Sequence, residues 1–76
     1  MIHKEKSEAA IKFGKRIAEL RMAVGLSQEA LAHRCNFNRT YVGSIERAEK
    51  APTINSIDKL AKGLNISLKD LFNYQN

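Results

Sequence analysis

The sequence falls into short segments with helical spacing of apolar residues, and a Ser, Thr or Asn stands before most of them. The side chain of such a residue can accept a hydrogen bond from a free N–H of the first helical turn. Pro52 is the only proline, and no stretch alternates apolar and polar residues convincingly. The pattern predicts an all-α fold of five helices without a sheet, in a single domain over residues 1–76.

The longest predicted helix runs from about Ser7 to Val24, and Gly25 ends it. Its apolar positions recur at spacings of four, three and four residues, which places them on one face. They are Phe13, Ile17, Leu20 and Val24.

Two further helices are predicted after the loop that contains Pro52. Thr53 can cap the first of them, whose inward residues are expected to be Ile54, Ile57, Leu60, Ala61 and Leu64. Ser67 with Asp70 resembles a capping box and predicts a last short helix over about residues 68–74. Its apolar residues are Leu68, Leu71 and Phe72.

The middle of the chain, over about residues 28–47, predicts two short helices joined by a tight turn. Ser27 can cap the first of them, and Asn36 can adopt the positive φ that a sharp turn requires. Asn38 can cap the second, which is expected to run to about Ala48. The buried edge of the first helix should consist of Leu31, Ala32 and Cys35. Such a pair is a helix-turn-helix, whose second helix can enter the major groove of DNA.

The second helix of this unit should bury Val42 and Ile45, and at about 100° per residue its other side is small, polar and cationic. A surface that enters a groove about 12 Å wide requires this character. The residues expected there are Arg39, Thr40, Gly43, Ser44 and Arg47, with Tyr41 at the boundary. Gly43 has no side chain and would let the helix approach a partner closely. The alternative is that Gly43 has no role and is tolerated, although glycine within a helix costs about 1 kcal/mol relative to alanine.

The polar residues of this unit can be assigned roles toward DNA. An arginine at the start of the helix can donate two hydrogen bonds to a guanine, and hydroxyl or amide groups can bind base edges or phosphates. The candidates for base contacts are Arg39, Thr40, Tyr41 and Ser44. The candidates for phosphate contacts are Gln28, Asn38 and Arg47. For each of them the alternative is a solvated side chain without a partner.

Composition adds weaker constraints. Thirteen Lys and Arg against eight Asp and Glu give a net charge of +5, which points to a polyanionic partner. No apolar run is long enough to span a membrane. A single cysteine cannot form an internal disulfide, which favours a reducing, cytoplasmic location. His3, His33 and Cys35 make a poor zinc set, so no metal, cofactor or catalytic residue is expected, and Cys35 is interpreted as core.

The segment LRMAVGLSQEALAHRCNFNRTYVGSIERAEKAPTINSIDKLAKGLNIS resembles the Cro and phage-repressor type of helix-turn-helix domain. The resemblance covers about residues 13–72 and implies a lambda-repressor-like fold of five helices. Within it, NRTYVGSIER is similar to the controller proteins of bacterial restriction–modification systems. Where the family usually has glycine after its IER, this chain has Ala48.

The resemblance also implies a function. As in the controller proteins it resembles, this chain is expected to form a homodimer that binds a near-palindromic operator in double-stranded DNA and regulates its own operon, with RNA polymerase as a further candidate partner. By the same likeness, Arg21 and Glu46 should form a structural ion pair, and the C-terminal helix should form the dimer interface. The candidates for that interface are Leu68 and Phe72.

Two alternatives stay open from the sequence. One is a phage-type repressor, and the other is an antitoxin or another protein-interaction module of the same fold. The cationic surface of the second helix disfavours an interaction module, since contact with a protein partner does not require it. Binding of mixed-sequence DNA across a salt series separates these classes.

Overall fold

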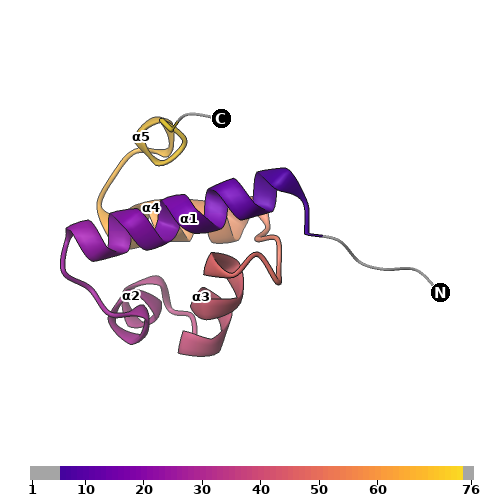
Figure 1. Cartoon of the computed structure of the whole chain (residues 1–76). Coiled ribbons are helices and arrows are strands. Elements are labelled where there is room, and N and C mark those ends of the chain that lie inside the picture. Colours follow the sequence, from indigo (N-terminus) through magenta and orange to yellow (C-terminus); the bar gives the residue numbers. More distant parts are fainter. Residues whose placement is uncertain (1–5, 75–76) are drawn as a thin grey trace.

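The computed structural model describes residues 6–74 and contains five helices, with no strand over that range (Figure 1). The helices are α1 Glu8–Ala23, α2 Gln28–Cys35, α3 Arg39–Glu46, α4 Ile54–Leu64 and α5 Leu68–Leu71. Each begins after a residue whose side chain accepts a backbone N–H of the first turn: Ser7, Ser27, Asn38, Thr53 and Ser67. The predicted all-α fold is confirmed, although α3 and α5 end earlier than expected. His3 lies outside the described residues.

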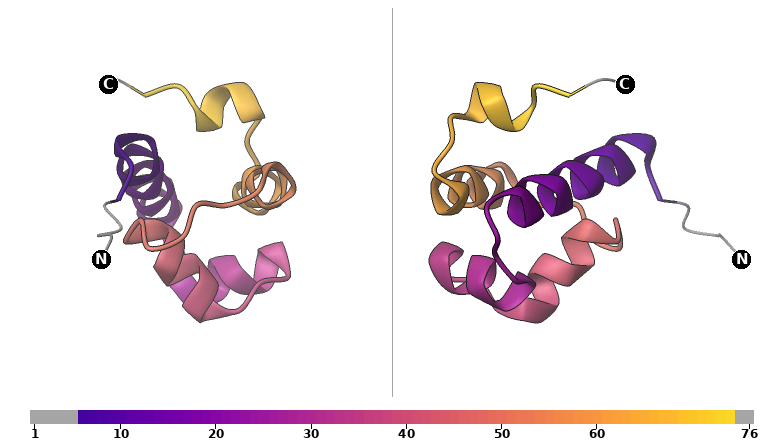
Figure 2. Two further views of the ribbon diagram at one scale, coloured as in Figure 1. Left: turned by 90° about the vertical axis from the view of Figure 1, so that its right-hand side faces the viewer. Right: turned by 60° about the vertical axis from the view of Figure 1, so that its left-hand side comes forward.

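The helices form three levels. In both views of Figure 2, α1 and α4 occupy the middle level, α2 and α3 lie on one side of it, and α5 lies on the other. Helix α3 packs against α1 and α2, and α4 packs against α2 and α5. The helix-turn-helix and the C-terminal helix therefore present surfaces on opposite sides of the molecule.

All five helices contribute apolar side chains to one core. The largest fully buried side chains are Ile17, Leu31, Val42, Ile45, Leu60 and Leu71. Two residues expected in the core are exposed instead. Val24 already lies beyond the last residue of α1, and Ile54, which is 80% exposed, is the first residue of α4. Periodicity places both on the correct face, but at a helix end no neighbouring element covers them.

Helices α1 to α4 end with the same backbone motif, in which a residue with positive φ follows the helix and two crossing hydrogen bonds satisfy its last carbonyls. The positive-φ residues are Gly25, Asn36, Ala48 and Asn65. At the end of α3, Ala48 N–H donates to the Ile45 carbonyl at 3.0 Å and Glu49 N–H donates to the Ser44 carbonyl at 2.8 Å. Ala48 is the only one of the four that is neither glycine nor asparagine, and the left-handed conformation costs such a residue about 1–2 kcal/mol.

Helix α3 lies very close to α1. A Cβ atom at Gly14 of α1 would stand 2.5 Å from the Ile45 carbonyl oxygen and 2.7 Å from that of Glu46. These backbone atoms cannot move aside without displacing α3, so this crossing requires glycine. The close approach fixes the position of the second helix of the helix-turn-helix.

Candidate nucleic-acid interface

Glu46 anchors the C-terminal end of α3 to the rest of the domain. Arg21 of α1 donates to it from Nε at 2.7 Å and from Nη2 at 3.1 Å, and also donates to the Leu26 carbonyl at 2.9 Å. The side chains of Arg21 and Glu46 are only 14% and 7% exposed. The hydrogen bond from Arg21 to Glu46 raises the pKa of the guanidinium above its ordinary value. The two residues expected to pair therefore form a charged, largely buried contact between α1 and α3.

Gln28, at the start of α2, also binds Glu46. The sequence did not indicate this contact. Gln28 Nε2 donates to Glu46 Oε1 at 2.9 Å. Its own Oε1 lies 3.5 Å from the position that a Cβ of Gly43 would occupy. Gln28 thus links the first turn of α2 to the end of α3, whatever contact it makes with a phosphate.

The N-terminal turn of α3 is the open part of the helix. Arg39 and Thr40 are both exposed, and Arg39 takes part in none of the ion pairs found among residues 6–74. Asn38 caps the helix, with its Oδ1 accepting the N–H of Tyr41 at 2.8 Å. The amide nitrogen of Asn38 still has donors to offer. Three neighbouring polar side chains can therefore reach a partner from a fixed helix end.

Tyr41 links α3 to α4 rather than standing free. Its ring meets that of Phe37 edge-on, with 4.8 Å between the ring centroids. Its hydroxyl donates to Ser56 Oγ at 3.0 Å. A concavity of about 540 Å³ opens beside the ring. It is lined by Asn36, Phe37, Asn38, Thr40, Tyr41, Ser44 and Lys50.

The predicted exposure of Gly43 and Ser44 is wrong. Ser44 is 7% exposed, and its hydroxyl donates to the Thr40 carbonyl at 2.9 Å. Gly43 is buried, and the nearest atoms to a Cβ there belong to the side chains of Arg47 and Gln28. The side chains of Arg47 and Gln28 lie close to Gly43, and Ser44 turns its hydroxyl back onto a carbonyl of its own helix. A base contact by Ser44 remains a prediction that requires its hydroxyl to leave Thr40.

The surface around α5 has the opposite character. Leu68 and Phe72 are 43% and 46% exposed, and the Phe72 ring packs on Phe13 with 5.5 Å between centroids. An apolar hollow of about 220 Å³ lies beside it, bounded in part by Pro52 and Ile57. Both residues predicted for a dimer interface thus lie on an apolar surface remote from α3.

Comparison with known proteins places this geometry in a family. The model of the family described as Helix-turn-helix matches residues 17–71. The chain is 35% identical to Control protein C.BamHI of Bacillus amyloliquefaciens, covering 82% of this chain and 78% of that protein. The restriction–modification controller protein C.AhdI from Aeromonas hydrophila superposes with a TM-score of 0.84 at 44% identity, covering 87% of this chain and 100% of that one.

This chain belongs to the controller-protein family. A further relative, the controller protein C.Esp1396I, has been solved as a tetramer in complex with its natural 35 base-pair operator. It superposes on this chain with a TM-score of 0.83 at 36% identity, covering 87% of each chain. The sequence resemblance to controller proteins is confirmed, and transcription regulation is the class of function of this chain.

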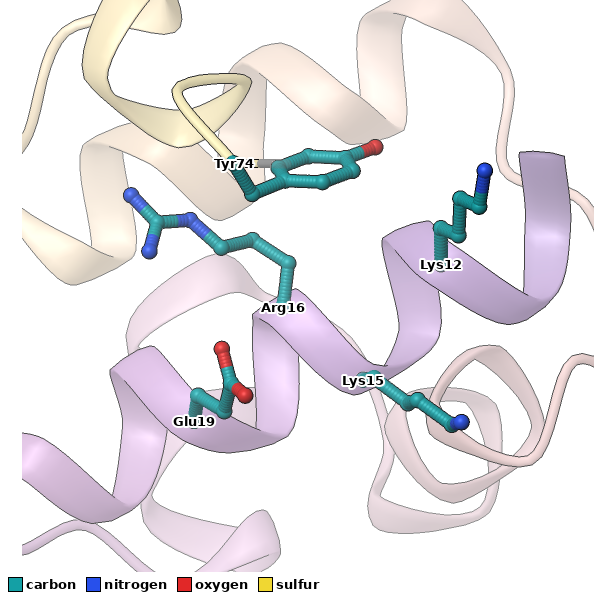
Figure 3. A pocket seen from close by; sticks show the side chains of 5 residues that line it. All are labelled: Lys12, Lys15, Arg16, Glu19 and Tyr74. Atoms are coloured by element: carbon teal, nitrogen blue, oxygen red, sulfur yellow. The ribbon is translucent and has the colours of Figure 1, made fainter. Parts of the chain in front are cut away.

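A further hollow in this controller protein lies along α1, on the side that meets the C-terminal segment. Figure 3 shows Arg16 and the Tyr74 ring over it, with Lys12, Lys15 and Glu19 around its edge. Its volume is about 290 Å³. Arg16 is engaged there, because it donates to the Leu71 carbonyl at 3.1 Å and to the Asp70 carbonyl at 2.7 Å. The hollow thus marks where α1 holds the end of α5.

Cys35 and His33 are the other candidates for nucleophilic or metal chemistry within residues 6–74. Cys35 is buried in the core, and burial raises the pKa of its thiol, so it is a poor nucleophile. His33 is exposed on α2. Residues 6–74 contain no group of three or more His, Cys, Asp or Glu side chains that could hold a metal ion. Over the same range, no helix is both long enough and apolar enough to cross a bilayer.

Proposed function

We propose that this protein binds a specific, near-palindromic operator as a homodimer and regulates transcription of its own operon. The observation that supports this most is the start of α3, where Arg39 and Thr40 are exposed on a helix whose far end is fixed by Arg21, Gln28 and Glu46. A rigid helix with free polar side chains at its N-terminus suits entry into the major groove. The operator complex of C.Esp1396I supports the same assignment.

Each polar residue of this surface is assigned a proposed contact with DNA. Arg39 reads a guanine through its two-pronged guanidinium, which is worth about 1–3 kcal/mol of discrimination. Thr40 and Tyr41 border the concavity beside the helix and contact the adjoining base pairs or backbone, and Ser44 reaches a base once its hydroxyl is released. The proposed phosphate contacts come from Gln28, Asn38 and Arg47, which fix the register of the protein on DNA.

The dimer is proposed to form through the α5 surface. Covering Leu68 and Phe72 with the same residues of a second copy would bury apolar area that the monomer leaves exposed. In this arrangement the two α3 helices should lie about 34–36 Å apart, one turn of B-DNA. The tetramer of C.Esp1396I supports assembly beyond a single chain. RNA polymerase is a further proposed partner, in the cytoplasm, and no enzymatic role is proposed.

Selection of bound sequences from a random DNA pool tests this function directly. We expect a near-palindromic sequence that is bound at least about a thousandfold more tightly than mixed-sequence DNA at the same salt concentration. A scrambled copy of the selected sequence is the control. Equal affinity for all sequences would contradict an operator-binding role, and failure to bind any DNA would favour a protein-interaction module.

A further inference from the structure

The C-terminal end of α3 carries an arginine that is already paired. Arg47 donates from Nε to one carboxylate oxygen of Glu49 at 2.9 Å and from Nη2 to the other at 3.1 Å. The guanidinium and the carboxylate therefore form two parallel hydrogen bonds. Such bidentate pairs are stronger than single hydrogen bonds between neutral groups. Both side chains are exposed, so the pair lies within reach of any polyanion that approaches α3.

The backbone fixes this pair in place. Ala48, in its left-handed conformation, reverses the chain immediately after Arg47. Glu49 is then held by its N–H, which donates to the Ser44 carbonyl at 2.8 Å, and Arg47 is held by its N–H, which donates to the Gly43 carbonyl at 3.0 Å. Lys6 Nζ also donates to the Arg47 carbonyl at 2.7 Å. The turn that ends α3 thus brings the Glu49 carboxylate onto the arginine proposed to bind DNA.

A phosphate and a carboxylate compete for the same guanidinium. Arginine offers both anions the same planar arrangement of donors, and one guanidinium edge cannot hold both at once. The hydrogen bond from Arg47 holds the pKa of Glu49 below its ordinary value, so the carboxylate is charged at neutral pH. That charge also repels a phosphate that comes close to it.

We propose that Glu49 occupies Arg47 in the free protein and must release it before Arg47 can bind a DNA phosphate, so that Glu49 limits how tightly the protein holds the DNA backbone. This inference rests on the proposed DNA-binding function. Glu49 is an affinity-limiting residue on this view, and Arg47 exchanges one anion for another when DNA binds. An exposed ion pair is weak enough to open in this way.

The test is the affinity of Glu49→Gln for mixed-sequence DNA across a salt series. Removing the carboxylate while keeping the shape of the side chain should tighten binding by about two- to fivefold at low salt. Asp58→Asn is the matched control, because it breaks another exposed ion pair, between Asp58 and Lys62 of α4, and removes the same charge. The inference is overturned if Glu49→Gln binds no more tightly than Asp58→Asn.

The same substitution in an Arg47→Gln background separates release of Arg47 from a general charge effect. Arg47→Gln alone should flatten the log–log salt dependence by about 0.9, the contribution of one phosphate contact. The gain from Glu49→Gln should then shrink to that of Asp58→Asn. A gain of unchanged size, or a salt dependence that Arg47→Gln leaves untouched, would contradict the inference. Thermal unfolding of each variant shows whether the fold is intact.

These outcomes are distinct from failure of the proposed function. A wild-type protein that binds no DNA overturns both proposals. A protein that selects an operator but shows no coupling between residues 47 and 49 overturns only the inference. The Arg47 Nε–H signal in NMR gives an independent readout, since Glu49→Gln should speed its exchange with water in the free protein.

Discussion

Two short helices, α3 and α5, lie on opposite sides of the molecule and expose opposite kinds of surface (Figure 2). Helix α3 exposes Arg39 and Thr40 at its start, whereas α5 and the residue after it expose Leu68 and Phe72. Neither helix is long enough to be stable alone. Each therefore takes its rigidity from its neighbours: α3 packs against α1 and α2, and α5 packs against α4 and accepts hydrogen bonds from Arg16 of α1.

An arginine of α1 holds the end of each helix. Arg21 binds α3 through the carboxylate of Glu46, and Arg16 binds α5 through the carbonyls of Asp70 and Leu71. The Arg21–Glu46 ion pair and the close approach at Gly14 both lie on the side of α3 that faces α1. The first turn of α3 is therefore free for polar contacts. At α5 the apolar side chains exceed what the small core can cover. The comparison indicates a polar surface for DNA and an apolar surface for a second copy of the chain.

The largest expected effect comes from forcing α3 away from α1. Gly14→Ala would place a methyl group against two backbone carbonyls, and we expect the free energy of unfolding to fall by about 2–3 kcal/mol. Chemical denaturation measures this loss. DNA binding should weaken as well, because the helix that carries Arg39 moves with the carbonyls.

Gly43→Ala is the matched control on α3 itself. Its Cβ would lie 3.0 Å from the end of the flexible Arg47 side chain and 3.5 Å from Gln28 Oε1, an ordinary contact, and no backbone atom is as close. Alanine also gains about 1 kcal/mol of helix propensity over glycine. We therefore expect unchanged or slightly higher stability. Equal losses for the two variants would show that the α1–α3 crossing is not the special contact of this fold.

A charge on the α5 surface should act on assembly and leave the fold intact. Leu68→Lys should weaken dimerisation by at least about tenfold, because it would bury a charge in an apolar interface. Sedimentation at tens of micromolar measures the change. Val24→Lys alters another exposed apolar residue, directly after the C-terminal end of α1, and should leave the dimer unchanged. Similar behaviour of the two variants would rule out the α5 surface as the interface.

A smaller effect is expected at the turn after α3. Ala48→Gly relieves a left-handed conformation, but it also loses a mostly buried methyl group and adds freedom to the unfolded chain. The net stabilisation should be about 0.5–1 kcal/mol, or a rise in Tm of about 2–8 °C. Ala51→Gly, in an exposed loop position, should give no gain. A lower Tm for Ala48→Gly would mean that the methyl group contributes more than the strain costs.

The sequence predicted the helices better than it predicted their surfaces. Cap residues and positive-φ residues such as Asn36 act through local hydrogen bonds, so their positions could be read from neighbouring residues alone. The buried position of Gly43 brings it close to Gln28 of α2, and the contact between Tyr41 and Ser56 joins α3 to α4. Periodicity along one helix carries no information about such coverage by other elements. The link from Gln28 to Glu46 was missed for the same reason.

The central claim is that the first turn of α3 reads base edges. Its most direct test is the affinity of Arg39→Ala for the selected operator, for copies with single base-pair changes, and for mixed-sequence DNA. We predict a loss of about tenfold or more on the operator, with preference relaxed at one base pair in each half-site and little change on mixed-sequence DNA. Equal weakening on every sequence would contradict the account, because Arg39 would then bind only the backbone.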